Sequence, residues 1–232
     1  MSFRKDTYDA IVQAIAPQQA TLVAVSKTKP LQDILDAYQH GVRDFGENYV
    51  QELVDKHASL PQDIRWHFIG HLQSNKVKYI APFVHLIHGV DSEKLLLAID
   101  KEGKKQNRII QCLLQVHIAQ EESKFGFDAQ TLLDMLSKYN PVNLAEGTEL
   151  KNVKIIGLMG MASFTTDESI IDKEFKTLKR IFDAAKTYQS SFCTMNVLSM
   201  GMSSDYSMAL ANGSNLIRVG SLLFGERTHS SS

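Results

Sequence analysis

The sequence predicts an α/β fold: a single (β/α)8 barrel of the TIM type with an extra helix at its N-terminal end. Short apolar runs alternate with helical patterns along the chain of 232 residues. The runs are apolar throughout, which is typical of a parallel sheet covered by helices on both faces. Eight such runs occur in order, and eight parallel strands suit a closed barrel of about 250 residues.

Each predicted strand is a run rich in Val, Ile, Leu and Phe, bounded by polar or turn-forming residues. The intervening segments have helical spacing. Residues 31–41 close at Gly41, and residues 92–105 begin with Ser92 as the expected N-cap and carry lysines in the last turn. The eight predicted strands are residues 21–26, 42–47, 65–71, 84–90, 108–118, 153–161, 194–202 and 216–225.

We expect residues 1–232 to form one domain, because neither a Pro-, Gly- or Ser-rich linker nor a repeat of fixed period divides the chain. Residues 1–18 are expected to hold the extra helix that precedes the first strand. The segment from Pro141 to Gly147 is interpreted as a loop, and the polar residues 228–232 as a frayed tail.

Charge and hydropathy argue against several classes of protein. Lysine and arginine number 25 against 26 acidic residues, so no overall field attracts nucleic acid or an anionic membrane. The chain has no apolar leader and no run of the roughly 20 apolar residues that span a membrane, so a cytoplasmic protein is expected. Cys112 and Cys193 lie in apolar surroundings and are expected to be buried, reduced thiols. The lack of a large apolar stripe favours a monomer.

The stretch "TLVAVSKTKP" places Lys27 directly after the first predicted strand. In a β/α barrel the functional site lies at the carboxyl ends of the strands, so a polar residue there is a candidate site residue. A partly desolvated lysine can form a Schiff base with a carbonyl compound. The alternative is a lysine whose stem packs on the barrel while its ammonium reaches solvent.

Small residues close the last two predicted strands. Gly201 precedes Ser203 in "GMSSD", and Gly220 precedes Ser221 in "RVGS". Glycines let a backbone approach a ligand, and loops after strands seven and eight are the recurrent phosphate site of this fold. An ordinary helix cap and glycine turn would give the same pattern. Arg218, inside the apolar run "LIRVG", favours the ligand site, because a guanidinium in a barrel strand requires a buried partner.

Polar residues also follow the second and third predicted strands. Asn48 lies in "FGENYVQE" and His71 in "WHFIGHLQSNK", so both are expected at the ligand-facing rim of the barrel. His67 and His71 share a face of an extended strand. Two histidines without a nearby third ligand do not make a metal site, and no metal is expected.

Together these motifs resemble the YggS/PROSC family of pyridoxal 5′-phosphate (PLP) homeostasis proteins, which is related to the N-terminal barrel of bacterial alanine racemase. The resemblance extends over nearly the whole chain. It rests on six motifs in the family's order: "LVAVSKTKP", "FGENYVQE", "WHFIGHLQSNK", "EESKFGF", "LSMGMSSDYSMAL" and "IRVGSLLFGER".

The resemblance implies a cofactor and a set of residues that bind it. Lys27 would hold PLP as an internal aldimine, Arg218 would face the pyridine nitrogen, and Asn48 would lie beside the ring. Ser203 and the "GS" pair after the eighth strand would hold the phosphate. The residues assigned to the cofactor are therefore Lys27, Asn48, Ser203, Arg218, Gly220 and Ser221.

The chemistry of Arg218 favours a carrier over an enzyme. PLP withdraws electrons best when its ring nitrogen is protonated, and a guanidinium beside that nitrogen disfavours a second positive charge. Alanine racemase also adds a β-domain with a catalytic tyrosine, for which a chain ending at Ser232 is expected to have no room. The expected function is PLP homeostasis without strong catalysis, with PLP-dependent apoenzymes as candidate recipients.

Other functions fit the same residues. One is a racemase-like PLP enzyme of narrow specificity, which would need a base opposite Lys27. Another is a class I aldolase acting on a phosphorylated sugar, although no carboxylate or tyrosine lies within "VAVSKTK" to relay a proton. A binding scaffold without a small ligand is the third alternative.

Overall fold

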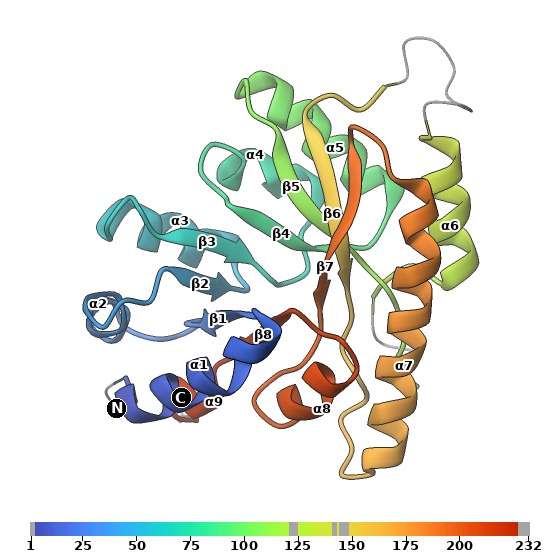
Figure 1. The fold of residues 1–232 in the computed structure, drawn as a ribbon. Coiled ribbons are helices and arrows are strands. Elements are labelled where there is room, and N and C mark those ends of the chain that lie inside the picture. Colours follow the sequence, from blue (N-terminus) through green and yellow to red (C-terminus); the bar gives the residue numbers. More distant parts are fainter. Residues whose placement is uncertain (1–2, 121–124, 141–142, 144–148, 227–232) are drawn as a thin grey trace.

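Eight parallel strands pair in sequence order and close into a barrel, so that β1 is hydrogen-bonded to both β2 and β8 (Figure 1). This computed structural model describes residues 3–120, 125–140, 143 and 149–226. The predicted barrel is confirmed. Its strands are β1 (Thr21–Val25), β2 (Asp44–Glu47), β3 (Arg65–Phe68), β4 (Leu86–Val90), β5 (Ile110–Gln115), β6 (Val153–Met159), β7 (Cys193–Ser199) and β8 (Leu216–Val219).

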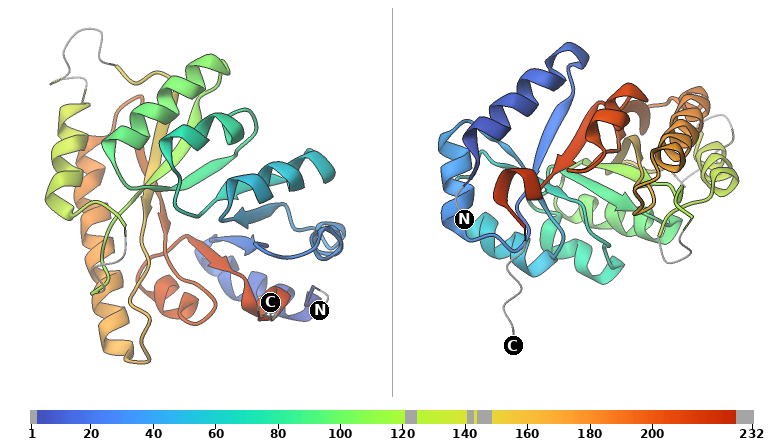
Figure 2. Two further views of the ribbon diagram at one scale, coloured as in Figure 1. Left: turned by 180° about the vertical axis from the view of Figure 1, so that it is seen from behind. Right: turned by 90° about the horizontal axis from the view of Figure 1, so that it is seen from below.

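Helices cover the outside of the barrel (Figures 1 and 2). The predicted extra helix is α1 (Lys5–Ile15), followed by a 3-10 turn over Ala16–Gln18. It begins beside the last helix, because the N–H of Arg4 donates to the carbonyl of Leu223 at 2.9 Å. The other helices are α2 (Leu31–Gln39), α3 (Val50–Ser59), α4 (Val77–Ile80), α5 (Glu93–Lys105), α6 (Ala129–Lys138), α7 (Glu168–Ala185), α8 (Tyr206–Ala211) and α9 (Ser221–Phe224).

The strands are apolar along their length because they bury two faces. All five residues of β4 are buried. One face of the barrel packs on the helices in a large cluster that contains Phe45 and Trp66. A separate, smaller cluster joins five strands from inside the barrel. Its buried members are Val23, Leu86, Leu113, Met159 and Leu216.

The structure corrects the end of the eighth predicted strand, residues 216–225. β8 ends at Val219, and Ser221–Phe224 form α9 instead of continuing the strand. The chain turns at Gly220, where a Cβ atom would stand 3.2 Å from the Cβ of Val25 and 3.3 Å from its carbonyl oxygen. The close approach of β1 thus favours glycine at the point where the strand changes into a helix.

Other local predictions have mixed outcomes. Ser92 caps α5 as predicted, since its hydroxyl accepts a hydrogen bond from the N–H of Leu95 at 3.4 Å. Cys112 and Cys193 are buried and free, and burial raises the pKa of the Cys193 thiol to about 12. The expected tail, 228–232, and most of the expected loop around Pro141 lie outside the described residues. No helix in the described part of the chain is long and apolar enough to cross a bilayer.

The first prediction concerns the close contact between β6 and β7. A Cβ at Gly157 would lie 1.7 Å from the carbonyl oxygen of Val197, so the strands could not keep their spacing. We expect Gly157→Ala to lower the free energy of unfolding by about 3 kcal/mol. Urea unfolding of this variant and of the surface control Lys101→Ala measures the effect, and equal stability of the two would contradict the proposed contact.

Candidate functional site

A cavity of about 400 Å³ lies at the carboxyl ends of the strands. Its position agrees with the general location of functional sites in β/α barrels. The apolar part of the lining includes Val25, Ile69 and Met161. The polar part includes every residue that the sequence predicted for the cofactor: Lys27, Asn48, Ser203, Arg218, Gly220 and Ser221.

Lys27 lies in the loop after β1, and its conformation is set by the neighbouring residue. Thr28 has a φ of 63°, in the left-handed region that β-branched residues rarely adopt. The Thr28 N–H donates to Glu52 Oε1 at 2.6 Å, which holds the strained residue in place from α3. This hydrogen bond holds the strained loop, and with it the half-buried Lys27, at the edge of the cavity.

A buried ion pair supports this loop from behind. Lys56, on α3, is 4% exposed, and its ammonium donates to Glu47 Oε1, Glu52 Oε1 and the carbonyl of Ser26 at 2.7, 2.7 and 2.8 Å. The Ser26 hydroxyl donates to Glu47 Oε1 at 2.6 Å. The three N–H groups of the ammonium thus have three acceptors, and the loop that carries Lys27 is connected to β2 and α3.

Glu47 was not predicted to be buried, because "GENYVQE" is also consistent with a solvated helix face. It is 0% exposed at the end of β2, and burial raises the pKa of its carboxyl, with Lys56 acting in the opposite direction. One signal in the sequence pointed to this network. Glu52 and Lys56 are four residues apart, the spacing at which opposite charges meet on a helix.

Asn48 follows β2 at the floor of the cavity, where it is packed against Gly70. A Cβ on Gly70 would lie 2.2 Å from the Asn48 carbonyl oxygen, so only a glycine permits this approach. The side-chain Oδ1 of Asn48 is buried without a hydrogen-bond partner among the described residues. An unsatisfied buried oxygen is costly, and a ligand with a hydrogen-bond donor would relieve that cost.

The ends of β7 and β8 meet through Ser203, whose hydroxyl accepts a hydrogen bond from the N–H of Gly220 at 3.2 Å. Gly201 has a φ of +98°, and a side chain there would also strike Ala209. Asp205 accepts from the N–H of Met202 at 2.6 Å. These contacts place two serine hydroxyls, on Ser203 and Ser221, along one wall of the cavity.

Arg218, on β8, is 4% exposed and completes the cavity from below. Its guanidinium donates to the Ser199 hydroxyl at 2.5 Å and to the Gly160 carbonyl at 3.1 Å. Burial lowers the pKa of Arg218 to about 10, and the nearby charge of Asp205 acts in the opposite direction. The group therefore remains a cation at neutral pH, and two of its five N–H groups donate to described residues of the protein.

The segment "GLMGMAS", residues 157–163, contains the end of β6 and the residues that follow it. Gly160 supplies a carbonyl to Arg218, and Met161 lines the cavity. Ser163 turns away from it, because its N–H and hydroxyl both bind the carboxylate of Glu174 at 2.7 Å. The segment thus contributes a carbonyl and an apolar side chain to the cavity wall.

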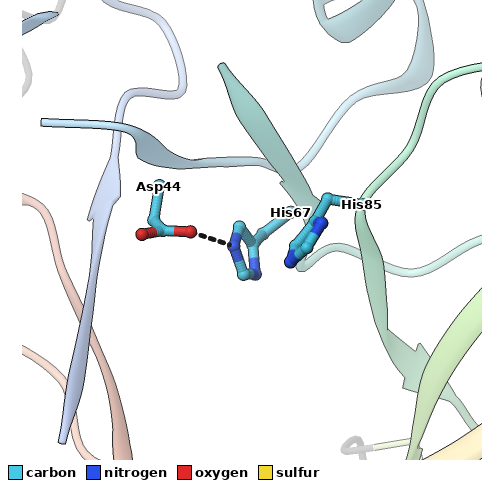
Figure 3. A group of neighbouring side chains, drawn as sticks. All are labelled: Asp44, His67 and His85. Carbon is cyan, nitrogen blue, oxygen red and sulfur yellow. Dashed lines mark hydrogen bonds and ion pairs between the residues drawn. The ribbon is translucent and has the colours of Figure 1, made fainter. Parts of the chain in front are cut away.

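The expectation that His67 and His71 share a strand face is wrong, because β3 ends at Phe68 and His71 lies beyond it. His71 binds Asp91 at 3.1 Å and stacks on Phe125, whereas His67 lies inside the barrel. Figure 3 shows His67 beside Asp44 and His85. Asp44 is the first residue of β2 and His85 directly precedes β4, so this group lies toward the amino ends of the strands, whereas the cavity lies at their carboxyl ends. The sequence could not indicate this group, because its members belong to three different strands or strand ends.

Fold and cavity together define a class of protein: a closed parallel barrel with a lysine, an arginine and small residues at its mouth. The family model for the alanine racemase N-terminal domain matches residues 5–228. Alanine racemase from Streptomyces coelicolor A3(2) superimposes with a TM-score of 0.73 at 14% identity, over 97% of this chain and 60% of that chain. At this identity the likeness shows a common barrel fold.

Within that class the chain belongs to the pyridoxal phosphate homeostasis protein family, as its motifs indicated. The pyridoxal phosphate homeostasis protein of Synechocystis sp. is 37% identical over 227 residues, which cover 97% of this chain and 99% of the relative. The PipY structures from Synechococcus elongatus superimpose with TM-scores of 0.85 without PLP and 0.83 with PLP bound. They are 34% and 33% identical and cover 95% of this chain and 99% of PipY.

The second prediction tests the buried ion pair. Lys56→Met leaves the Glu47 carboxylate without its cation and should lower the free energy of unfolding by about 3–5 kcal/mol near neutral pH. Because burial raises the pKa of Glu47 in the folded state, lowering the pH protonates the folded carboxyl first. The deficit of the variant should therefore shrink as the pH falls through that pKa.

Urea unfolding at several pH values measures this deficit. The control is Lys105→Met, which removes an exposed partner of Glu102 and should cost at most about 1 kcal/mol. The double variant Glu47→Leu/Lys56→Met should recover much of the lost stability, since no buried charge remains unpaired. A deficit that is small, or that does not depend on pH, would contradict the buried pair.

Proposed function

We propose that this chain binds PLP in the cavity at the mouth of the barrel, through a covalent bond to Lys27. In this proposal it holds and exchanges the cofactor in intracellular PLP and amino-acid balance and has no strong catalytic activity. The observation that carries the proposal is the convergence of the Lys27 amine, the buried guanidinium of Arg218 and the hydroxyls of Ser203 and Ser221 on a single cavity. Its volume of about 400 Å³ suits a small-molecule site.

The groups in the cavity match the parts of PLP. PLP carries an aldehyde that condenses with an amine, a pyridine nitrogen and a phosphate. In the proposed arrangement Lys27 receives the aldehyde carbon and Arg218 donates to the ring nitrogen. Ser203 and Ser221 bind the phosphate from the strand ends, where Gly220 leaves room for close approach. Membership of the family and the PLP bound in PipY support the same assignment.

Asn48 is the neighbour of the ring in this proposal. Its buried Oδ1 has no partner among the described residues, so it is available to a donor on a ligand. The position of its backbone is fixed by Gly70. A preorganised acceptor of this kind orients a ligand at little entropic cost.

Two features of the cavity argue against strong amino-acid chemistry. The first is the charge of Arg218, which disfavours protonation of the ring nitrogen and so weakens its use as an electron sink. The second is the shortage of bases. Among the described residues that line the cavity there is no tyrosine or histidine, and Glu226 is the one carboxylate. Lys29, the second amine, donates to the carbonyls of Phe224 and Gly225 at 2.8 and 3.1 Å.

The third prediction locates the covalent bond. Purified protein loaded with PLP should absorb in the visible, and borohydride should fix the cofactor to the peptide that contains Lys27. Lys27→Ala should lose both the absorption band and the adduct, because the proposal places the covalent bond on Lys27, whereas the Lys29 amine donates to the carbonyls of Phe224 and Gly225. Lys29→Ala is the matched control at the same rim and should keep both. Mass spectrometry locates the adduct, and an adduct on another lysine would refute the assignment.

The fourth prediction concerns catalysis. In deuterated water, the PLP-loaded protein should exchange the α-hydrogen of common amino acids no faster than the same concentration of free PLP, because the described residues of the cavity offer no tyrosine or histidine as a second base. Nuclear magnetic resonance of alanine, serine and glutamate measures this exchange. Rapid exchange or racemisation of any of them would favour the racemase-like enzyme instead.

A further inference from the structure

Arg218 is a buried cation that has no carboxylate within hydrogen-bond distance among the described residues. An isolated charge is expensive inside a protein unless polar groups compensate it. Its closest partner is the hydroxyl of Ser199, on β7, which is 0% exposed. Ser199 in turn contacts a further buried side chain, His88.

A row of hydrogen-bonded polar side chains continues from Ser199 through the interior of the barrel. Ser199 Oγ lies 3.3 Å from His88 Nδ1, and His88 Nε2 lies 2.9 Å from His67 Nδ1. The row ends at the opposite mouth, where His67 Nε2 lies 3.0 Å from Asp44 Oδ1 (Figure 3). We call this row of side chains the relay. From the cavity downward it consists of Arg218, Ser199, His88, His67 and Asp44.

When both imidazole rings are neutral, the two ends of the relay set the direction of every hydrogen bond in it. A guanidinium can only donate, so Ser199 accepts from Arg218 and its own hydrogen is free for His88 Nδ1. An ionised carboxylate can only accept, so His67 Nε2 carries the hydrogen that points at Asp44. The remaining bond must then run from His88 Nε2–H to His67 Nδ1. Each neutral histidine then carries its single hydrogen on Nε2.

Charges around the relay are consistent with this assignment. Arg65 donates to both oxygens of Asp44, at 2.7 and 2.5 Å, and the hydrogen bonds from Arg65 and His67 lower the pKa of Asp44 well below its usual range against the opposing effect of burial. Burial also lowers the pKa of His88 well below its usual value, which favours the neutral ring. Because Arg65 occupies both oxygens, the group formed by Asp44, His67 and His85 is interpreted as the anionic end of the relay and not as a metal site.

We propose that the relay is a second, internal part of the cofactor site. It aligns four hydrogen bonds from the guanidinium of Arg218 to the carboxylate of Asp44, and so orients the cation that meets the ring nitrogen. Ser199 and His88 are positioning residues in this view, since they act through Arg218. The consequence for the cofactor rests on the proposed function, whereas the direction of the hydrogen bonds does not.

The first test needs no cofactor. In protein labelled with ¹⁵N in its histidine rings, His67 and His88 should both give the signals of the neutral Nε2–H form, each assigned by its loss in a His→Gln variant. Ser199→Ala should shift the Nδ1 signal of His88, whose donor it removes. Ser214→Ala is the matched control, because Ser214 is a buried serine whose hydroxyl donates to the Met200 carbonyl at 2.7 Å. An Nδ1–H or charged ring in the wild type would overturn the relay.

The second test uses PLP. Ser199→Ala should raise the dissociation constant of PLP about tenfold, the cost of losing one hydrogen bond to a charged group. It should also shift the ring-nitrogen signal of ¹⁵N-labelled PLP, which a purely structural change elsewhere would not do. Ser214→Ala should leave both unchanged.

The outcomes separate the two proposals. If wild-type protein binds PLP and Ser199→Ala changes neither the affinity nor the ring-nitrogen signal, the role of the relay toward the cofactor is wrong. If the wild type binds no PLP, the proposed function and that role both fail, while the histidine signals still report whether the relay exists.

Discussion

The positive charge of Arg218 inside a closed barrel is the constraint on which the candidate site depends. A parallel barrel leaves its interior no access to bulk water, so a guanidinium there must be met by oriented dipoles or by a counter-ion. The structure supplies a hydroxyl and a carbonyl at short range. This solution leaves three N–H groups of Arg218 without protein partners among the described residues, next to the cavity.

The chain treats its two buried cations differently, and the difference follows from their positions. Lys56 supports a loop, and two carboxylates and a carbonyl saturate its three donors directly. Such an amine has no capacity left for a ligand. Arg218 faces the cavity, and the carboxylate of Asp44 lies at the far end of the relay. Distance from the anion keeps the guanidinium available to a ligand while its charge is still compensated.

The interior of the barrel is accordingly divided. Val23, Leu113 and Leu216 belong to the apolar cluster inside the barrel, on β1, β5 and β8. On the neighbouring strands β3 and β4, His67 and His88 interrupt this apolar lining. The rigidity of close-packed surroundings keeps such polar groups in register, since rotation of either imidazole would break two hydrogen bonds at once. Mechanical support for Lys27 comes instead from outside the barrel, through Glu52 on α3.

The sequence by itself determined the barrel, its eight strands and the residues that gather at its mouth. Strand order and apolar runs suffice for this, because in a parallel barrel every strand end must reach the same rim, so Lys27 and Ser203 line one cavity despite their separation in the sequence. The end of β8 was not predictable, because the turn at Gly220 depends on the approach of Val25 from another strand. The tertiary structure alone decided that Glu47 is buried and that His67 meets Asp44, since both depend on side chains brought together across strands. The spacing of residues along a chain indicates local secondary structure, whereas contacts between different strands leave no regular spacing in the sequence.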